Sequence, residues 1–170
     1  GDDTLINNTQ IYFAKVKPNA IMPTKREEDA GYDIYICTDE DYIIIKPHET
    51  KILPTGIASA CDKKYYFQIF ERGSTGTKGI GQRCGVIDSS YRGEWFIPVT
   101  NHNLHYIVIA REKVTLKDVF GEIAPANTVF YPMDKAIAQA VLLPVPKVQV
   151  KEISYEELKN IKSERGTGNL

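Results

Sequence analysis

The sequence lacks any long apolar run. No stretch approaches the ~18 residues that a membrane-spanning helix needs, so we expect no membrane as a partner. The sequence also lacks an excess of one charge, because 21 basic residues face 22 acidic ones. Non-specific binding to nucleic acid needs a clear surplus of Lys and Arg, so we expect no nucleic-acid partner either. An anionic ligand must therefore be met by local cations or by a metal ion.

Cysteine is scarce. Cys37, Cys61 and Cys84 are an odd number without the spacing of metal ligands, which is typical of reduced thiols in a cytosolic protein. Residues 1–10 are polar and acidic and do not have the basic and apolar regions of a signal peptide. We therefore expect a cytoplasmic protein, and the length of 170 residues suits one domain.

Long helical patterns are also missing, whereas short runs rich in Val, Ile, Tyr and Phe recur between turns that contain Pro or Gly. These runs predict strands over residues 11–16, 42–46, 51–58, 65–70, 95–100, 106–110, 128–131, 137–143 and 148–153. Many short strands indicate an all-β sandwich or barrel. Two short helices are expected, one over 115–120 and one after Ser154, which forms a capping-box pattern with Glu157.

The stretch 85–93, GVIDSSYRG, is the most informative of the chain. Val and Ile favour a strand, and the Ser-Ser and Arg-Gly pairs end or bend it, so Asp88 and Tyr91 are expected side by side at the mouth of a sheet. A carboxylate there can take a proton from water, and an aromatic face can pack against a flat or sugar-like ligand. The alternative is a hairpin with a surface aspartate and a half-buried tyrosine.

A glycine-rich stretch, ERGSTGTKG at 71–79, follows a predicted strand. Its glycines free the backbone, so consecutive N–H groups can converge on phosphate oxygens. Arg72 and Lys78 add charge, and Ser74 or Thr75 can add a hydroxyl donor. The stretch is not a P-loop, because Gly rather than Ser or Thr follows Lys78. The alternative is an ordinary turn.

Two further polar residues stand out in strand-like sequence. Asp33, within AGYDI at 30–34, offers a second carboxylate at the start of a strand, although a turn aspartate can instead bond its own backbone. Gln139, within AIAQA at 136–140, is a lone amide among apolar residues. A buried amide needs a partner, which can be the neighbouring backbone or a ligand.

Together and in this order, these segments resemble the motifs of the trimeric dUTP diphosphatase (dUTPase) family, and the resemblance extends from about Val16 to the end of the sequence. The matched segments are AGYD at 30–33, RGSTG at 72–76, GVIDSSYRG at 85–93, AIAQ at 136–139 and RGTG at 165–168. The resemblance departs at Gly73, where the family has a serine, and at Asp134-Lys135, where it has glycine followed by a charged pair.

The resemblance implies an all-β subunit, a distorted jelly-roll or barrel-like domain over 1–153. A short C-terminal helix or arm over 154–170 would reach a neighbouring subunit of a homotrimer. The implied reaction is hydrolysis of dUTP to dUMP and pyrophosphate, by water attack on the α-phosphorus with Mg²⁺. That reaction keeps uracil out of DNA and supplies dUMP.

The resemblance also implies roles for single residues. Asp88 would activate the attacking water, Tyr91 would pack on the deoxyribose, and Asp33 would hold Mg²⁺ through its water shell. The hairpin at 82–87 would read uracil through its backbone, and Arg165 would close over the γ-phosphate at a neighbouring subunit's site. The full set of implied substrate contacts is Arg72, Gly73, Ser74, Thr75, Gln82, Gly85, Val86, Ile87, Tyr91, Gln139, Arg165, Gly166, Thr167 and Gly168.

The segment from about residue 103 to 131 is longer than the connection that a minimal family member has between its third and fourth motifs. Some bacteriophage members carry an insertion at this place, which indicates a phage or prophage origin and hence the host cytoplasm. The insertion suggests a second function class, in which residues 113–128 bind a regulatory protein partner. The nearest enzymatic rival is dCTP deaminase, but the position of its catalytic glutamate is Pro98 here, which can neither donate nor accept a side-chain proton.

Overall fold

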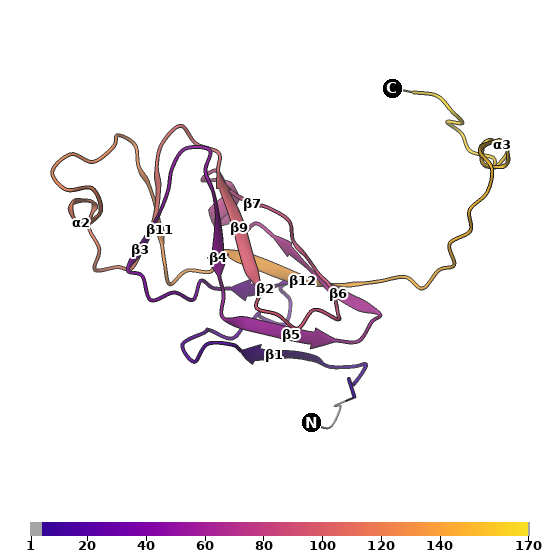
Figure 1. The fold of residues 1–170 in the computed structure, drawn as a ribbon, viewed down its shortest axis with the longest axis horizontal. Coiled ribbons are helices and arrows are strands. Elements are labelled where there is room, and N and C mark those ends of the chain that lie inside the picture. The colour runs from indigo at the N-terminus through magenta and orange to yellow at the C-terminus, as the bar shows by residue number, and fades with distance from the viewer. Residues whose placement is uncertain (1–4, 170) are drawn as a thin grey trace.

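The computed structural model describes residues 5–169, and these are arranged mainly as short strands (Figure 1). Three short helices interrupt the strands: α1 (Gly73–Gly76), α2 (Leu116–Phe120) and α3 (Tyr155–Lys159). The strands are β1 (Ile11–Lys15), β2 (Gly31–Ile34), β3 (Tyr42–Ile45), β4 (Thr50–Pro54), β5 (Ile57–Cys61), β6 (Tyr65–Phe70), β7 (Ile80–Gln82), β8 (Val86–Ile87), β9 (Phe96–Asn101), β10 (Ile107–Ala110), β11 (Val129–Pro132) and β12 (Ala138–Pro144). The prediction of an all-β domain is confirmed.

The described strands pair into four small sheets, in the orders β1-β5, β11-β10-β3, β2-β12-β6-β8 and β4-β9-β7. Neighbouring strands run antiparallel except β10 and β11, which run parallel. A parallel pair needs a crossover connection, and residues 111–128 supply it. The two ends of the predicted insertion are therefore strands of the domain itself, and α2 lies on the crossover between them. As expected, this helix begins at the Thr115 cap and ends at Gly121.

The core is a cluster of buried aliphatic and aromatic side chains between the sheets. Phe67 and Trp95 lie at its centre, with ring centroids 5.2 Å apart, and Phe13 packs on both. The indole N–H of Trp95 donates to Ser59 Oγ at 3.0 Å, so the one polar group of this buried ring has a partner. This packing makes a rigid body whose strand ends carry the polar residues.

Strand β12 organises the polar residues, because it pairs with β2 on one side and with β6 on the other. Its Gln139 lies opposite Asp33 of β2 and opposite Phe70 of β6. Directly opposed residues on paired strands point to the same face of the sheet. Arg72 follows two residues after Phe70, where β6 has ended. The register thus brings Asp33, Gln139 and Arg72 to one edge.

Two strand predictions are wrong in detail. The predicted strand over 51–58 is two strands, because Gly56 has a φ of 69° and turns the chain between β4 and β5. The predicted strand over 148–153 is not a strand. Val148 and Val150 are 76% and 96% exposed, and no neighbouring strand in the described chain satisfies their backbone. A β-type composition without a partner edge gives only an extended segment.

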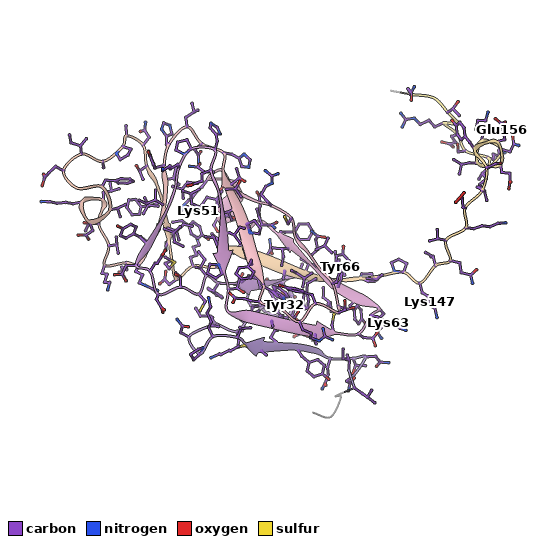
Figure 2. The ribbon with its side chains drawn as sticks, viewed as in Figure 1. Tyr32, Lys51, Lys63, Tyr66, Lys147 and Glu156 are labelled. Carbon is purple, nitrogen blue, oxygen red and sulfur yellow. The ribbon has the colours of Figure 1, made fainter. Side chains whose placement is uncertain are left out.

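The chain after Pro144 leaves the body of the domain as an extended tail that carries α3 (Figure 1). Figure 2 shows Lys147 where this tail begins and Glu156 on α3, far from the sheet that carries Tyr32 and Tyr66. The predicted helix is confirmed, and Ser154 Oγ accepts a hydrogen bond from Glu157 N at 3.1 Å. No helix among the described residues is long and apolar enough to cross a membrane.

Gly31 provides a test of the β2–β12 register. A methyl carbon added at this position would collide with Oε1 of Gln139, and it would lie 3.0 Å from Gln139 Cβ and 3.1 Å from Gln139 Cδ. We expect Gly31→Ala to lower the free energy of unfolding by about 1–3 kcal/mol, because the Gln139 side chain must leave its place. Denaturant titration at fixed protein concentration measures this change.

The matched background is Gln139→Ala, which removes the Oε1 and Cδ atoms that the methyl group meets. In that background, Gly31→Ala should lower the free energy of unfolding by less than about half as much as it does in the parent, because residues in contact are energetically coupled. Equal costs in both backgrounds would show that Gly31 does not make room for Gln139.

Candidate active site

The first candidate site is a cavity of about 780 Å³ at the edge where β2, β6 and β12 meet. It contains the predicted Asp33, Arg72 and Gln139 together, as the strand register predicts. Its cationic, hydroxyl and amide side chains are donors of the kind that phosphate oxygens need, and Glu28, Asp29 and Asp33 add carboxylates beside them. The lining residues are Thr24, Lys25, Arg26, Glu28, Asp29, Ala30, Gly31, Asp33, Arg72, Gly73, Ser74 and Gln139.

Arg72 is the most heavily bonded side chain of this cavity. Its Nε lies 3.5 Å from Asp33 Oδ1, and its Nη1 donates to the Ala136 carbonyl oxygen at 3.0 Å and to Ser74 Oγ at 3.2 Å. The amide of Gln139 donates to the Glu71 carbonyl oxygen at 2.8 Å. Gln139 therefore has a backbone partner and also faces the cavity.

The glycine-rich stretch does not form the open loop that the sequence suggests. Residues 73–76 make one helical turn, α1, and the N–H groups of Thr75, Gly76 and Thr77 donate to carbonyls inside it. Thr75 is buried, and its hydroxyl exchanges hydrogen bonds with the backbone N–H and C=O of Arg72. Ser74 faces the cavity instead, so of the two candidate hydroxyls it is Ser74 that a ligand can reach.

A second, smaller cavity of about 260 Å³ surrounds Asp88 and Tyr91. The Tyr91 N–H donates to the Asp88 carbonyl oxygen at 3.1 Å, closing a turn, and the Tyr91 hydroxyl donates to the Glu94 carbonyl oxygen at 2.7 Å. Asp88 is exposed and Tyr91 is 41% exposed, so both can meet a ligand. The lining residues are Val86, Ile87, Asp88, Tyr91, Glu94 and Phe96.

The connection between β7 and β8 borders this second cavity, and the expected hairpin at 82–87 is not a paired one, because β7 pairs with β9 and β8 with β6. Gly85 has a φ of 130°, and a Cβ there would lie 2.9 Å from the Ile69 carbonyl oxygen, so only glycine fits. Its own carbonyl oxygen accepts a hydrogen bond from Ile69 N at 2.8 Å, which ties the connection to β6. Gln82 is held by its N–H, which donates to Glu71 Oε2 at 3.0 Å, and its side chain lines neither cavity.

The last predicted segment, RGTG at 165–168, lies on the exposed tail, away from both cavities (Figure 1). Arg165 Nε donates to the Gly168 carbonyl oxygen at 2.8 Å, within the segment itself. The two cavities share no lining residue. One chain therefore carries three separate groups of predicted site residues.

Among the residues that sequence reasoning missed are two basic residues that line the first cavity and a tyrosine that contacts its lining side chains from outside. Lys25 and Arg26 line it because Thr24 bridges to Asp33 on β2, and a turn signal alone does not reveal that pairing. Arg26 also lowers the pKa of Asp29 through a hydrogen bond of 2.8 Å. The third is Tyr131, whose hydroxyl lies 3.3 Å from Arg72 Nη1 although the two residues are far apart in sequence.

The dUTPase family model matches residues 17–114. The deoxyuridine 5'-triphosphate nucleotidohydrolase of Nautilia profundicola is 34% identical and covers 95% of this chain and 96% of its own length. The enzyme of the same name from Leptospira interrogans is 36% identical over 54% of this chain, a match that spans 66% of that protein.

A solved mutant dUTPase of Staphylococcus bacteriophage 80alpha, with dUpNHpp, has the same fold. Its TM-score is 0.73 at 22% identity, and the match covers 95% of this chain and 96% of the phage protein. With the family match over most of the domain and a relative matched along nearly its full length, the chain belongs to the dUTPase family.

Proposed function

We propose that this protein hydrolyses dUTP to dUMP and pyrophosphate by water attack on the α-phosphorus. The observation that carries the proposal is the pairing of Asp88 with Tyr91 in one cavity, together with the phosphate-type cavity around Arg72. Family membership supplies the reaction. The reaction supplies dUMP, and removal of dUTP keeps uracil out of DNA.

In this proposal, Arg72, Ser74 and Gln139 bind the phosphates. A triphosphate carries several negative charges, so donors arranged before substrate arrives supply the largest part of the rate enhancement. The contacts of Arg72 with Asp33, Ala136 and Ser74 support such an arrangement, because they orient the guanidinium in the free protein. Asp88 takes the proton of the attacking water, and Tyr91 packs on the deoxyribose.

Mg²⁺ would bind in the first cavity, with oxygen ligands from both the protein and the substrate. The described residues hold no group of three or more His, Cys, Asp or Glu side chains suited to a metal. Mg²⁺ is commonly held by one or two carboxylates, water and substrate phosphates, so Asp33 could hold the ion without a cluster of carboxylates. When bound with dUTP, Mg²⁺ would neutralise phosphate charge.

The active site is proposed to form between copies of the chain in a homotrimer. The separation of the Arg72 cavity from the Asp88 cavity supports this, since a single dUTP must contact both groups. The tail supports it too, because its apolar side chains are exposed in the isolated chain and can be buried on another copy. These side chains are Val145, Val148, Val150, Tyr155, Leu158 and Ile161.

The deaminase alternative is not favoured. Pro98 lies within β9, opposite Ile52 of β4, and its carbonyl oxygen accepts a hydrogen bond from Arg83 N at 2.8 Å. A proline at this point offers no side-chain acid or base, so it cannot replace a catalytic glutamate.

A second role as an interaction module is proposed for residues 113–128. The helix α2 is secured by a reciprocal cap between Thr115 and Asp118, and beyond it Ile123 is 87% exposed. This segment lines neither candidate cavity, so a regulatory partner could bind it without filling the site. An Ile123→Asp protein that loses a host-lysate partner but keeps dUTP turnover would support this role. Retention of every parental partner would refute it.

The role of Asp88 is tested by Asp88→Asn. A positioned base typically contributes ~10²–10⁴-fold, so kcat for dUTP should fall by that factor while KM changes little. A pyrophosphate-release assay with dUTP, dCTP, dTTP and UTP measures turnover and selectivity. Asp39→Asn, an exposed carboxylate in the β2–β3 connection, is the matched control. Turnover within about threefold of the parent would exclude Asp88 as the base.

The composite site is tested by mixing two inactive variants, Asp88→Asn and Arg72→Ala, and refolding them together in equal amounts. If each site takes Arg72 from one copy and Asp88 from another, about a quarter of the sites regain both groups in random trimers. Activity should therefore return to about that fraction of the parental rate. A site contained in one chain would give no recovery. The control mixes Asp88→Asn with the Asp88→Asn/Arg72→Ala double variant, which should stay inactive.

The role of the tail is tested by Arg165→Ala. If Arg165 closes over the triphosphate, its loss should lower kcat/KM for dUTP by at least tenfold, because a charge-assisted hydrogen bond to phosphate is lost. Light scattering should give the parental mass, since this change leaves the apolar part of the tail intact. Lys162→Ala is the matched tail control. Parental turnover by Arg165→Ala would count against closure by the tail.

A further inference from the structure

Tyr131 lies behind the phosphate-type cavity, and none of the matched motifs contains it. Its side chain is fully buried, and it comes from β11, a different sheet from the one that carries Asp33 and Gln139. Parallel pairing with Ile109 of β10 fixes its position. The ring is therefore held by the core, and its hydroxyl contacts Arg72 and Ser74, which line the cavity.

The Tyr131 hydroxyl makes three polar contacts. It lies 2.5 Å from the Ala136 carbonyl oxygen, 3.3 Å from Arg72 Nη1 and 3.2 Å from Ser74 Oγ. A phenol has one hydrogen to donate, and the shortest contact assigns that hydrogen to Ala136. Arg72 and Ser74 must then both donate to the phenol oxygen.

This arrangement fixes the orientation of both donors. In the part of the chain that the structure describes, Arg72 bonds through Nη1 and pairs with Asp33 through Nε. The Nη2 nitrogen remains for a ligand in the cavity that Arg72 lines. The Ser74 proton rests on the Tyr131 oxygen and can turn to a phosphate oxygen when one arrives.

Two lysines add to the same place. Lys78 Nζ lies 5.6 Å and Lys135 Nζ lies 5.7 Å from the centre of the Tyr131 ring. Ammonium groups within about 6 Å of an aromatic face are attracted to it. Tyr131 thus contacts three cations, Arg72 through its oxygen and the lysines through its ring.

We propose that Tyr131 is a positioning residue, whose hydroxyl orients Arg72 and Ser74 for the phosphate chain of the substrate. The inference rests on the proposed function of the cavity as the phosphate subsite of dUTP. It goes further by assigning the affinity for the phosphate chain in part to a buried phenol that does not touch the substrate.

The test is Tyr131→Phe, which keeps the buried ring and removes only the hydroxyl. Hydrogen bonds to a charged group are strong, so the inhibition constant of dUpNHpp, a slowly hydrolysed dUTP analogue, should rise about tenfold. The inhibition constant of deoxyuridine, which has no phosphates, should stay within about twofold. KM for dUTP should rise with that of the analogue.

The control for loss of a hydroxyl is Tyr106→Phe, because Tyr106 packs on Phe120 beside the crossover, outside both cavities. Its inhibition constants should equal those of the parent. A second measurement combines Tyr131→Phe with Arg72→Ala. Since Tyr131 acts largely through Arg72, removing its hydroxyl in that background should raise the inhibition constant of dUpNHpp by less than about threefold.

Three results would overturn the proposal: a parental inhibition constant for dUpNHpp in Tyr131→Phe, an equal loss for deoxyuridine, or full additivity with Arg72→Ala. Equal losses for both ligands would assign Tyr131 a merely structural role. Absence of dUTP turnover in the parent protein would refute the proposed function instead, so the two failures are distinguishable.

Discussion

The pairing of β12 with β2 and β6 is the constraint on which the candidate site depends. It places Gln139 between Asp33 and the end of β6, from which Arg72 enters the cavity. Because strand side chains alternate, a slip of one residue would turn Gln139 into the core and an apolar neighbour into the cavity. The absence of a side chain at Gly31 gives Gln139 its room. The hydrogen-bond ladder thus also aligns the side chains that we propose to bind phosphate.

In the proposed function, the two cavities divide the chemistry of one reaction. The cavity around Arg72 has cations and an amide suited to phosphate, and the cavity around Asp88 has a carboxylate and aromatic surface suited to water and a nucleoside. Strands packed on one core carry both cavities, while Arg165 lies on the exposed tail and lines neither of them. The proposed assembly of the site between copies gives this division a reason, since such a site needs no single complete pocket.

Local sequence predicted most of the strands, the position of α2, the cap of α3 and the grouping of Asp88 with Tyr91, because these features depend on neighbours within a few residues. It failed where pairing partners decide. Val148 and Val150 have β-type side chains but no adjacent edge, and the glycines of α1 did not reveal that Thr75 closes a helical turn. Tyr131 was out of reach because its hydroxyl meets Arg72 only through the packing of two sheets.

We propose that one nucleotide bridges residues of different copies, and a crystal structure of the assembled protein with dUpNHpp and Mg²⁺ would show whether it does. We expect uracil against residues 82–87, Asp88 beside the α-phosphate, and the phosphate chain on Arg72 and Ser74 of another copy. Phosphates bound away from Arg72, or a nucleotide held within a single chain, would refute the proposal.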